Sequence, residues 1–175
     1  TIMNTLNTWY NNNLASYEED YIDTGTGFCS DRNTASGDNY TDSSFYYAPY
    51  DRRNGGASLQ CHDDDILSQD NGKLSNPIGL ITIDEAVLTG LTNTANTGSY
   101  LYTGESYWTM SPSRFDSRRA YIFHMLSSGY VGGFADGWGY VSNGNGVRPV
   151  INIRADVQIT GSGTTSDPFK VVGAS

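Results

Sequence analysis

Apolar residues near the start of the chain recur at steps of three and four, the spacing of one face of an α-helix. This pattern predicts a helix over residues 1–21. The apolar stripe consists of Ile2, Leu6, Trp9, Tyr10, Leu14 and Tyr17. Thr and Asn on the opposite face are mediocre helix formers, so packing must hold this helix. We interpret the stripe as core, because such stripes are far more often core than cofactor sites.

The clearest local pattern in the chain is a capping box. Thr82 is followed three residues later by Glu85, which predicts a capped helix over residues 82–89 with Gly90 as its C-terminal stop. The acidic pair Asp84 and Glu85 suits the positive end of the helix dipole. We therefore interpret these two acids as structural rather than as a general acid/base pair.

Short apolar or alternating runs between turn residues predict strands elsewhere. The predicted strands lie near residue 28 and at residues 45–47, 100–102, 107–110, 120–126, 130–131 and 147–153, followed by a closing hairpin at 157–172. Residues 78–81 are predicted to form a short buried strand or a lead-in to the helix that follows. We expect Trp108 in the core, with Phe123 and Met125 beneath the surface of the strand at 120–126. Pro149 interrupts the strand at 147–153, which places that strand at an edge or a bulge.

Composition favours a β-rich, loop-rich fold over a helical bundle. The 175 residues include 20 Gly and 13 Tyr, with 37% hydrophobic and only 17% charged residues. Solubility therefore depends on Asn, Ser, Thr and Gly rather than on ion pairs. A chain of this length fits one domain with a sizeable core.

The net charge of -9 disfavours nucleic-acid binding through phosphate neutralisation, and an anionic membrane surface would repel the chain. Lys and Arg cluster only at Arg52-Arg53 and Arg118-Arg119. The chain has neither an apolar run long enough to span a bilayer nor a signal-peptide core. Because it starts at Thr1, we expect a trimmed or mature fragment that lacks its anchor or signal.

The cysteine count favours an exported protein. Cys29 and Cys61 fit a single disulfide, and the alternative is two unrelated buried thiols. Neither has the spacing of a zinc site. The run at residues 62–65, one His followed by three Asp, looks like a metal cluster. However, three adjacent carboxylates cannot all reach one ion from an extended backbone, so we interpret this run as a solvated acidic turn.

Motifs of the common enzyme classes are missing from the sequence. There is no GxSxG, HExxH, Walker or Rossmann pattern. The two histidines, His62 and His124, lie in no supporting motif. Glu18, Glu19, Asp20 and the acids at residues 63–65 lie in polar stretches, without the apolar surroundings that raise a carboxyl pKa for glycosidase chemistry. We therefore predict a non-catalytic protein without a cofactor or a metal.

The stretch from residue 107 to 153 sets large aromatics and arginines among Gly, Ser and Ala. A Gly-rich frame cannot bury all these rings, and aromatics with Arg on a loop-rich frame are typical of recognition surfaces. The candidate ligand-binding residues are Arg114, Phe115, Arg118, Tyr121, His124, Tyr130, Phe134, Asp136, Trp138 and Tyr140. The alternative is an irregular β region that happens to hold aromatics. We expect Arg148 to be structural, pairing with a carboxylate or with carbonyl groups.

Several short motifs occur in an order known from one group of proteins. They are GLITIDE at residues 79–85, YLYTG at 100–104, YWTMSP at 107–112 and GVRPVINI at 146–153, with WYNNNL at 9–14, FCSDR at 28–32 and DPF at 167–169. In these motifs the chain resembles exported proteins of Gram-positive gut bacteria and their phages, which often carry a pilin-like N-terminal anchor. That group is similar to C-type-lectin-fold proteins, including the variable proteins of diversity-generating retroelements and the formylglycine-generating enzymes.

The resemblance covers nearly the whole chain and implies an α+β domain with a C-type-lectin-like fold. Two helices would flank a small antiparallel sheet, and a long irregular insertion would carry the ligand surface. In the variable proteins, positions before a C-terminal strand are diversified, and the matching window here is residues 114–142. Formylglycine-generating activity is not implied, because it needs a C-terminal cysteine pair and no Cys follows Cys61. Pro112 and Pro149 lack the Glu and Asn neighbours of calcium-dependent sugar sites.

These observations predict a non-catalytic recognition or adhesion domain, diversified as a surface protein or a phage receptor-binding protein. Its partner would be a protein or glycan on a cell surface, and neither nucleic acid nor the membrane itself. Its place would be extracellular, at the cell surface or on a phage particle. Two alternatives remain: a structural pilus-tip or fibre module, and a hydrolase acting on cell-wall or glycan material.

Overall fold

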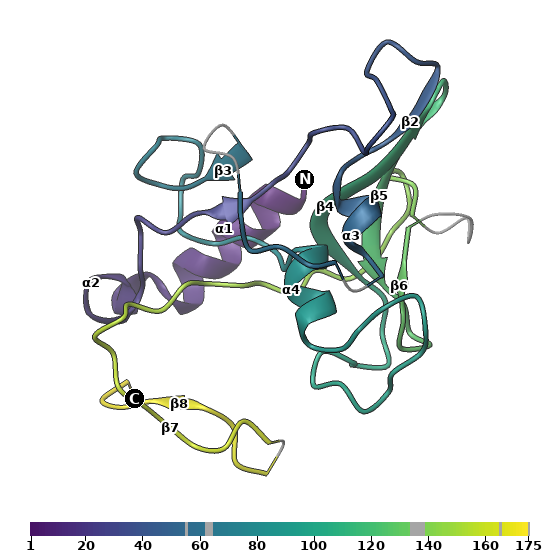
Figure 1. Cartoon of the computed structure of the whole chain (residues 1–175). Helices are drawn as coiled ribbons and strands as arrows, with labels where there is room; N and C mark the ends of the chain where they lie inside the picture. Colours follow the sequence, from purple (N-terminus) through teal and green to yellow (C-terminus); the bar gives the residue numbers. More distant parts are fainter. Residues whose placement is uncertain (55, 62–64, 134–138, 165, 175) are drawn as a thin grey trace. The chain divides into compact units, whose positions relative to one another are not determined.

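The computed structural model describes residues 1–54, 56–61, 65–133, 139–164 and 166–174. Short helices and a four-stranded antiparallel sheet are joined by long loops, which confirms the α+β class (Figure 1). The chain divides into two compact units. Unit 1 consists of Thr1–Gly27, Ser68–Gly79 and Pro149–Ser175, and unit 2 consists of Phe28–Leu67 and Leu80–Arg148.

Unit 1 opens with helix α1 (Ile2–Asn13), as the apolar periodicity predicts. The hydroxyl of Thr1 caps the helix by accepting a hydrogen bond from the Asn4 backbone N–H at 3.4 Å. Leu6 and Tyr10 are buried, as expected for the core stripe. Trp9 is instead 41% exposed. Leu6 and Tyr10 are four residues apart and share the buried face, whereas Trp9 lies at the border of that face.

The predicted helix over residues 1–21 is broken at Leu14, whose φ of -125° is not helical. A 3-10 turn, η1 (Ala15–Tyr17), and a short helix, α2 (Glu18–Tyr21), follow the break. The change of direction lets the Tyr10 hydroxyl donate to the Glu18 carboxylate at 2.8 Å. Burial and this negatively charged acceptor both raise the pKa of Tyr10.

The C-terminal part of unit 1 is only partly regular. The predicted strand at residues 147–153 is wrong as a continuous strand, because only two isolated antiparallel bridges form within it, Gly79 with Val150 and Ile22 with Ile153. Pro149 cannot donate to a ladder, which limits regular pairing here. The closing hairpin is confirmed as β7 (Ile159–Thr160) paired with β8 (Lys170–Val171).

The main sheet belongs to unit 2 and has the order β2-β4-β5-β6, with every neighbouring pair antiparallel (Figure 1). Its strands are β2 (Ser44–Tyr46), β4 (Tyr107–Asp116), β5 (Arg119–Met125) and β6 (Val131–Gly132). Helices α3 (Pro49–Arg52) and α4 (Ile83–Leu88) contact β4, and β1 (Phe28–Cys29) pairs separately with β3 (Ile66–Leu67). These strands confirm the predictions near residues 28, 45–47, 107–110, 120–126 and 131. Residues 78–81 form no strand and lead into α4, with one isolated bridge at Gly79.

The predicted strand at residues 100–102 is wrong. This segment is a turn, in which the Tyr102 N–H donates to the Ser99 carbonyl at 3.0 Å. Leu101 is buried, and its carbonyl accepts hydrogen bonds from the Tyr107 hydroxyl at 2.7 Å and from Arg148 at 3.1 Å. Arg148 therefore pairs with a carbonyl group, as expected.

Strand β4 buries small hydroxyl side chains at alternate positions. The Thr109 hydroxyl donates to the Phe123 carbonyl at 2.7 Å, and the Ser113 hydroxyl donates to the Gly133 carbonyl at 2.7 Å. The Ser111 hydroxyl accepts from the Ile83 N–H at the start of α4 at 2.9 Å. Small side chains allow this close approach, and each bond fixes β4 against a neighbouring element.

Helix α4 carries the complete predicted capping box. The Thr82 hydroxyl accepts from the Glu85 N–H at 3.1 Å, and the Glu85 carboxylate accepts from the Thr82 N–H at 2.8 Å. Gly90 has a φ of +85°, the left-handed conformation expected just after a helix end. Trp108, Phe123 and Met125 are buried, in agreement with their assignment to the core.

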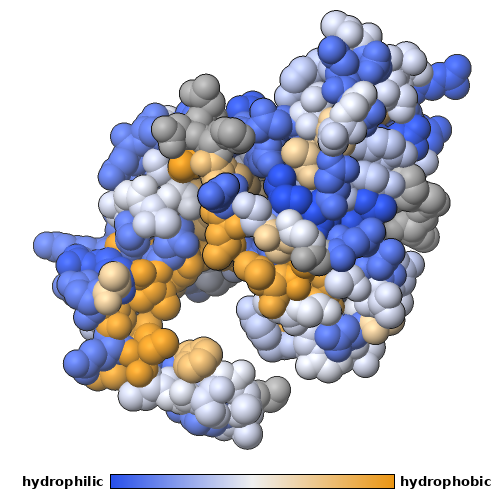
Figure 2. Space-filling view, in the orientation of Figure 1, coloured by the Kyte–Doolittle hydropathy of each residue, from blue (hydrophilic) through white to orange (hydrophobic). Residues whose placement is uncertain are grey.

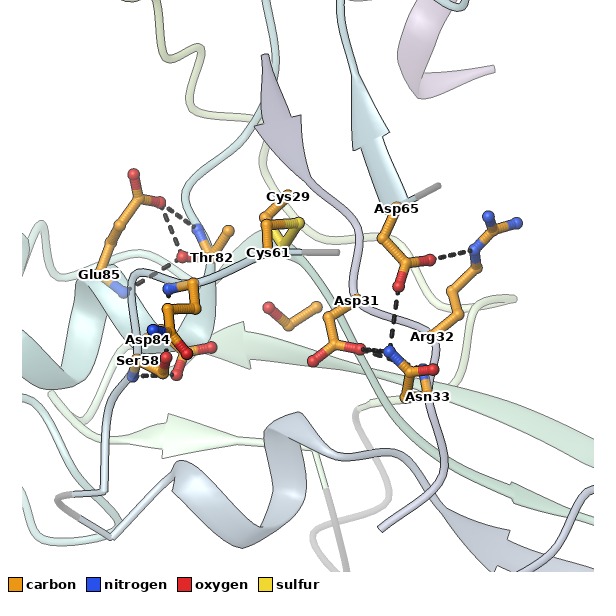
Figure 3. The surroundings of a disulfide bond; sticks show 12 residues. Cys29, Asp31, Arg32, Asn33, Ser58, Cys61, Asp65, Thr82, Asp84 and Glu85 are labelled. Atoms are coloured by element: carbon orange, nitrogen blue, oxygen red, sulfur yellow. Dashed lines mark hydrogen bonds and ion pairs between the residues drawn. A yellow bond between two sulfur atoms is a disulfide. The ribbon is translucent and has the colours of Figure 1, made fainter. Parts of the chain in front are cut away.

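A disulfide between Cys29 and Cys61 confirms the predicted pairing (Figure 3). Buried acids surround it. Asn33 donates its side-chain N–H groups to Asp31 at 2.9 Å and to Asp65 at 3.2 Å. Asp65 is thus buried and hydrogen-bonded, so the prediction of a solvated acidic turn is wrong for this residue, while residues 62–64 lie outside the described part of the chain.

Arg52, on α3, joins these acids to α4. Its guanidinium group donates to both carboxylate oxygens of Asp84, at 2.7 and 3.0 Å, and to Asp31 at 2.8 Å. Asp84 also accepts from the Ser58 N–H at 2.8 Å (Figure 3). Asp84 is buried, which confirms a structural role for it. These charged hydrogen bonds raise the pKa of Arg52.

Replacing both cysteines, Cys29→Ser with Cys61→Ser, should lower the free energy of unfolding by about 3 kcal/mol, because the disulfide restricts the unfolded chain over a 32-residue separation. Urea unfolding measures this change. A reductant should shift the wild type to the stability of the double variant and leave the variant unchanged. Equal stability of both proteins under oxidising conditions would contradict the prediction.

Asp84→Ala should destabilise the protein by about 3 kcal/mol, because it leaves the Arg52 guanidinium and the Ser58 N–H without their shared carboxylate. The matched control is Asp156→Ala, which removes an exposed carboxylate from Arg154 and should change stability little. Urea unfolding of the two variants gives the comparison. Similar losses in both would show that the buried carboxylate has no special role.

Candidate functional site

The register of the main sheet places four polar and aromatic residues opposite one another. Tyr46 of β2 pairs with Arg114 of β4, and Arg114 pairs with Tyr121 of β5. Tyr121 in turn forms an isolated antiparallel bridge with Tyr140. Directly opposite residues of antiparallel strands point to the same face of a sheet. The four side chains therefore line up across four segments of the chain.

Three further residues extend this line at its two ends. At one end the Tyr50 ring stacks on Tyr46 with centroids 4.0 Å apart, and the Arg53 guanidinium lies 3.5 Å from the Tyr50 centroid. At the other end the Arg119 guanidinium lies 4.6 Å from the Tyr140 centroid. We call this set the Arg–Tyr row. Its members, in order, are Arg53, Tyr50, Tyr46, Arg114, Tyr121, Tyr140 and Arg119.

Arg114 occupies the centre of the row. Its guanidinium carbon lies 5.4 Å from the Tyr46 centroid and 5.7 Å from the Tyr121 centroid, and one terminal nitrogen donates to the Ser44 hydroxyl at 3.1 Å. A cation between two aromatic rings is attracted by both, by about 0.5–2 kcal/mol for each contact depending on burial. These contacts hold the guanidinium in place, so little side-chain freedom remains to be lost on binding.

Asp116 closes the turn between β4 and β5 next to the row. One of its oxygens accepts from the Tyr121 hydroxyl at 2.8 Å, and the other accepts from the Arg118 N–H at 3.0 Å. These hydrogen bonds, that of Tyr121 first, hold the pKa of Asp116 below its ordinary value. Burial and the Asp116 carboxylate raise the pKa of Tyr121 to about 12. At neutral pH the acid is charged and the phenol is not.

The region of the row concentrates positive charge in an acidic protein. Arg53, Arg114 and Arg119 belong to the row, and the exposed Arg118 lies in the adjoining turn. These four are part of only 10 Lys and Arg residues in a chain of net charge -9. Among the described residues, two carboxylates accept hydrogen bonds from the row: Asp116 accepts from the Tyr121 hydroxyl, and Asp38 accepts from the Tyr46 N–H at 2.7 Å. Figure 2 shows the end of unit 2 near β2 as hydrophilic or neutral.

The structure brings together three of the residues predicted from the sequence. Arg114, Tyr121 and Tyr140 lie in the row. Arg118 is exposed beside it. Tyr121 is only 7% exposed, so its ring offers little surface to a ligand. Its part in the row is to hold its neighbours through its hydroxyl and its ring contacts. The Arg119 guanidinium donates to the Tyr140 hydroxyl at 2.6 Å, which fixes the exposed end of the row.

Other predicted residues lie elsewhere. Phe115 points away from the row and packs on the buried Phe45, with ring centroids 5.5 Å apart. Tyr130 lines an open depression together with Glu105 and Asn145. The remaining three predicted residues, Phe134, Asp136 and Trp138, lie outside the described part of the chain.

His124 is fully buried, which corrects the expectation that it faces a ligand. It lies on β5, which has β4 on one side and β6 on the other, and its ring meets Trp108 edge-on with centroids 5.8 Å apart. The alternation of residues along the strand at 120–126 predicts which side chains share a face of the strand. It does not predict that the protein covers the strand on both faces at His124. His124 is therefore part of the interior of unit 2.

Four members of the row were not predicted from the sequence: Tyr46, Tyr50, Arg53 and Arg119. The first three lie far before the predicted window in the sequence, and the pairing of β2 with β4 and the contact of α3 with β4 bring them to it. The adjacent arginines at residues 52–53 and 118–119 were visible in the sequence as the only basic pairs. This was the one available signal, and it does not reveal that Arg52 faces buried acids while Arg53 faces a ring.

Within the described ranges, no group of three or more His, Cys, Asp or Glu residues is placed to hold a metal ion. Among the same residues, no helix has the length and apolar character needed to cross a membrane. Comparison with protein-family models, curated proteins and solved structures finds no match to this chain.

Tyr121→Phe should raise the pKa of Asp116 toward its ordinary value, because the variant removes the hydrogen bond that contributes most to the shift. A lowered pKa means that Asp116 favours the folded state above its unfolded pKa, and that this contribution is lost as the pH falls through the folded value. Carboxyl NMR titration measures the change. Asp156, whose lowered pKa is due to Arg154, is the internal reference and should not respond. An unchanged Asp116 titration would contradict the assignment.

Proposed function

We propose that this protein is a non-catalytic recognition domain that binds a macromolecular ligand at a cell surface through the Arg–Tyr row. The observation that supports this most is the cross-strand register of Tyr46, Arg114, Tyr121 and Tyr140. Core packing alone does not require cations between the rings. Three guanidinium groups held against four rings form a surface prepared for contact.

The chemistry of the row suits protein recognition. Tyr and Arg are enriched among the residues that dominate binding energy at interfaces. Each offers a large contact area with a polar end, and here their positions are fixed by ring and cation contacts before a ligand arrives. Preorganisation of this kind lowers the entropic cost of binding.

We further propose that the domain has a C-type-lectin-like fold and belongs to the diversified surface or phage proteins that its motifs resemble. The α+β architecture with long loops supports this, and Arg114, Arg119, Tyr121 and Tyr140 all fall within the window at residues 114–142. The disulfide supports an oxidising, extracytoplasmic location. Diversification at exposed row positions would change ligand choice without altering the hydrogen bonds of β4.

The test is retention of intact bacterial cells and purified surface fractions on immobilised protein. Arg119→Ala and Tyr140→Ala should each lower retention of a bound target by at least about fivefold, because they remove the exposed end of the row. Lys170→Ala, an exposed cation on β8 in unit 1, is the matched control and should leave retention unchanged. All variants should melt within about 2 °C of the wild type.

Equal retention by wild type, Arg119→Ala and Tyr140→Ala would contradict the proposal. A loss of retention that goes with an equal loss of thermal stability would also count against it, since the residues would then be structural. Retention that falls only in the row variants, at unchanged melting temperature, supports recognition through the row.

A further inference from the structure

The faces of the tyrosine rings in the row are largely occupied by neighbouring members of the row. Tyr50 has Arg53 at 3.5 Å and Tyr46 at 4.0 Å, measured to its ring centroid. Tyr140 has Arg119 at 4.6 Å and Tyr121 at 4.8 Å. A neutral sugar binds aromatic residues by stacking on a free ring face. The row offers little of that surface.

What the row presents instead is guanidinium nitrogen and phenol oxygen. Arg118 and Arg119 are exposed, and Arg114 is half-buried between two rings. A guanidinium group recognises planar oxyanions by donating two parallel hydrogen bonds. One nitrogen of Arg114 already donates to the Ser44 hydroxyl and one of Arg119 to the Tyr140 hydroxyl. Each guanidinium group has five N–H donors, so the exposed Arg118 and Arg119 can still donate to a carboxylate. The arrangement is therefore suited to carboxylates.

The local charge favours the same kind of ligand. Arg114, Arg118 and Arg119 lie in or beside the row, and the carboxylates of Asp38 and Asp116, within the described residues, already accept hydrogen bonds from the protein. The rest of the chain is acidic, since the net charge is -9. An acidic partner would be repelled by most of the molecule and attracted to this region, which orients its approach.

We propose that the ligand of the Arg–Tyr row is an acidic protein segment, bound through the carboxylates of its Asp and Glu side chains. This inference rests on the proposed function and adds the chemical class of the partner. A protein segment is favoured over an acidic glycan because Tyr and Arg together are the residues most enriched at protein–protein hot spots. Asp116, next to Tyr121, opposes the ligand charge and so limits affinity.

The experiment uses fluorescence anisotropy with a labelled peptide that alternates Glu and Ser, and the full chain as the binder. The Glu peptide should bind, its Gln counterpart should not, and Kd should rise at least about tenfold between 50 and 500 mM NaCl. Arg118→Ala and Arg119→Ala should each raise Kd by about three- to tenfold, with Arg119→Lys between wild type and Arg119→Ala. Lys170→Ala should leave Kd unchanged.

Asp116→Asn provides a test of opposite sign. It removes the negative charge and keeps one oxygen, which can accept from the Tyr121 hydroxyl, while the hydrogen bond from the Arg118 N–H is lost. Because the opposing charge is gone, the Glu peptide should bind about two- to fivefold more tightly. General destabilisation of the turn would weaken binding instead. Tighter binding by Asp116→Asn together with weaker binding by Arg119→Ala supports the inference.

Several outcomes would overturn it: no binding of the Glu peptide, equal binding of the Gln peptide, or insensitivity to the row substitutions. A heparin-derived oligosaccharide is tested in parallel, and binding of this glycan without binding of the Glu peptide would assign the row to acidic glycans. If cell retention depends on Arg119 while the Glu peptide does not bind, the acidic-protein inference fails and the proposed recognition function stands. If retention does not depend on the row, the proposed function itself fails.

Discussion

The pairing of β4 with a strand on each side is the constraint on which the rest of unit 2 depends. Side chains along a strand alternate between faces, so a shift of one residue would turn every side chain of β4 to the other side of the sheet. Arg114 would then face the interior, and Phe115 would leave its contact with Phe45. Hydrogen bonds from Thr109 and Ser113 to backbone carbonyls on other segments fix the register.

Packing contacts and the contacts proposed for recognition therefore lie at adjacent positions of the same strand. Phe115 packs on the aromatic Phe45, while the preceding Arg114 is held between tyrosine rings on the opposite face. The buried positions are filled by side chains that make hydrogen bonds inside unit 2. Substitutions at the exposed end of the row, such as at Arg119, are thus separated from the contacts that determine the register.

Two groups of charged residues in unit 2 have different surroundings. Asp31, Asp65 and Asp84 are buried near the disulfide, and Arg52 joins two of them across α3 and α4. Their hydrogen bonds are satisfied within the protein, so they hold structure and are not available to a ligand. The arginines of the row lie against rings near the surface. The overall charge of -9 consequently says little about the local field at the row.

The sequence by itself determined the local features: the start of α1, the capping box of α4, the strands around Trp108 and Phe123, the disulfide and the closing hairpin. Each depends on residues close in sequence or, for the cysteines, on a pair with a single partner to choose. Sequence also identified the arginine- and aromatic-rich window, because composition reports what a segment contains. Only the tertiary structure decided that His124 is interior, that Asp65 is buried, and that Tyr46, Tyr50 and Arg53 complete the row. Those outcomes depend on which strands become neighbours, and long-range pairing leaves no mark in the local pattern of a strand as short as β2.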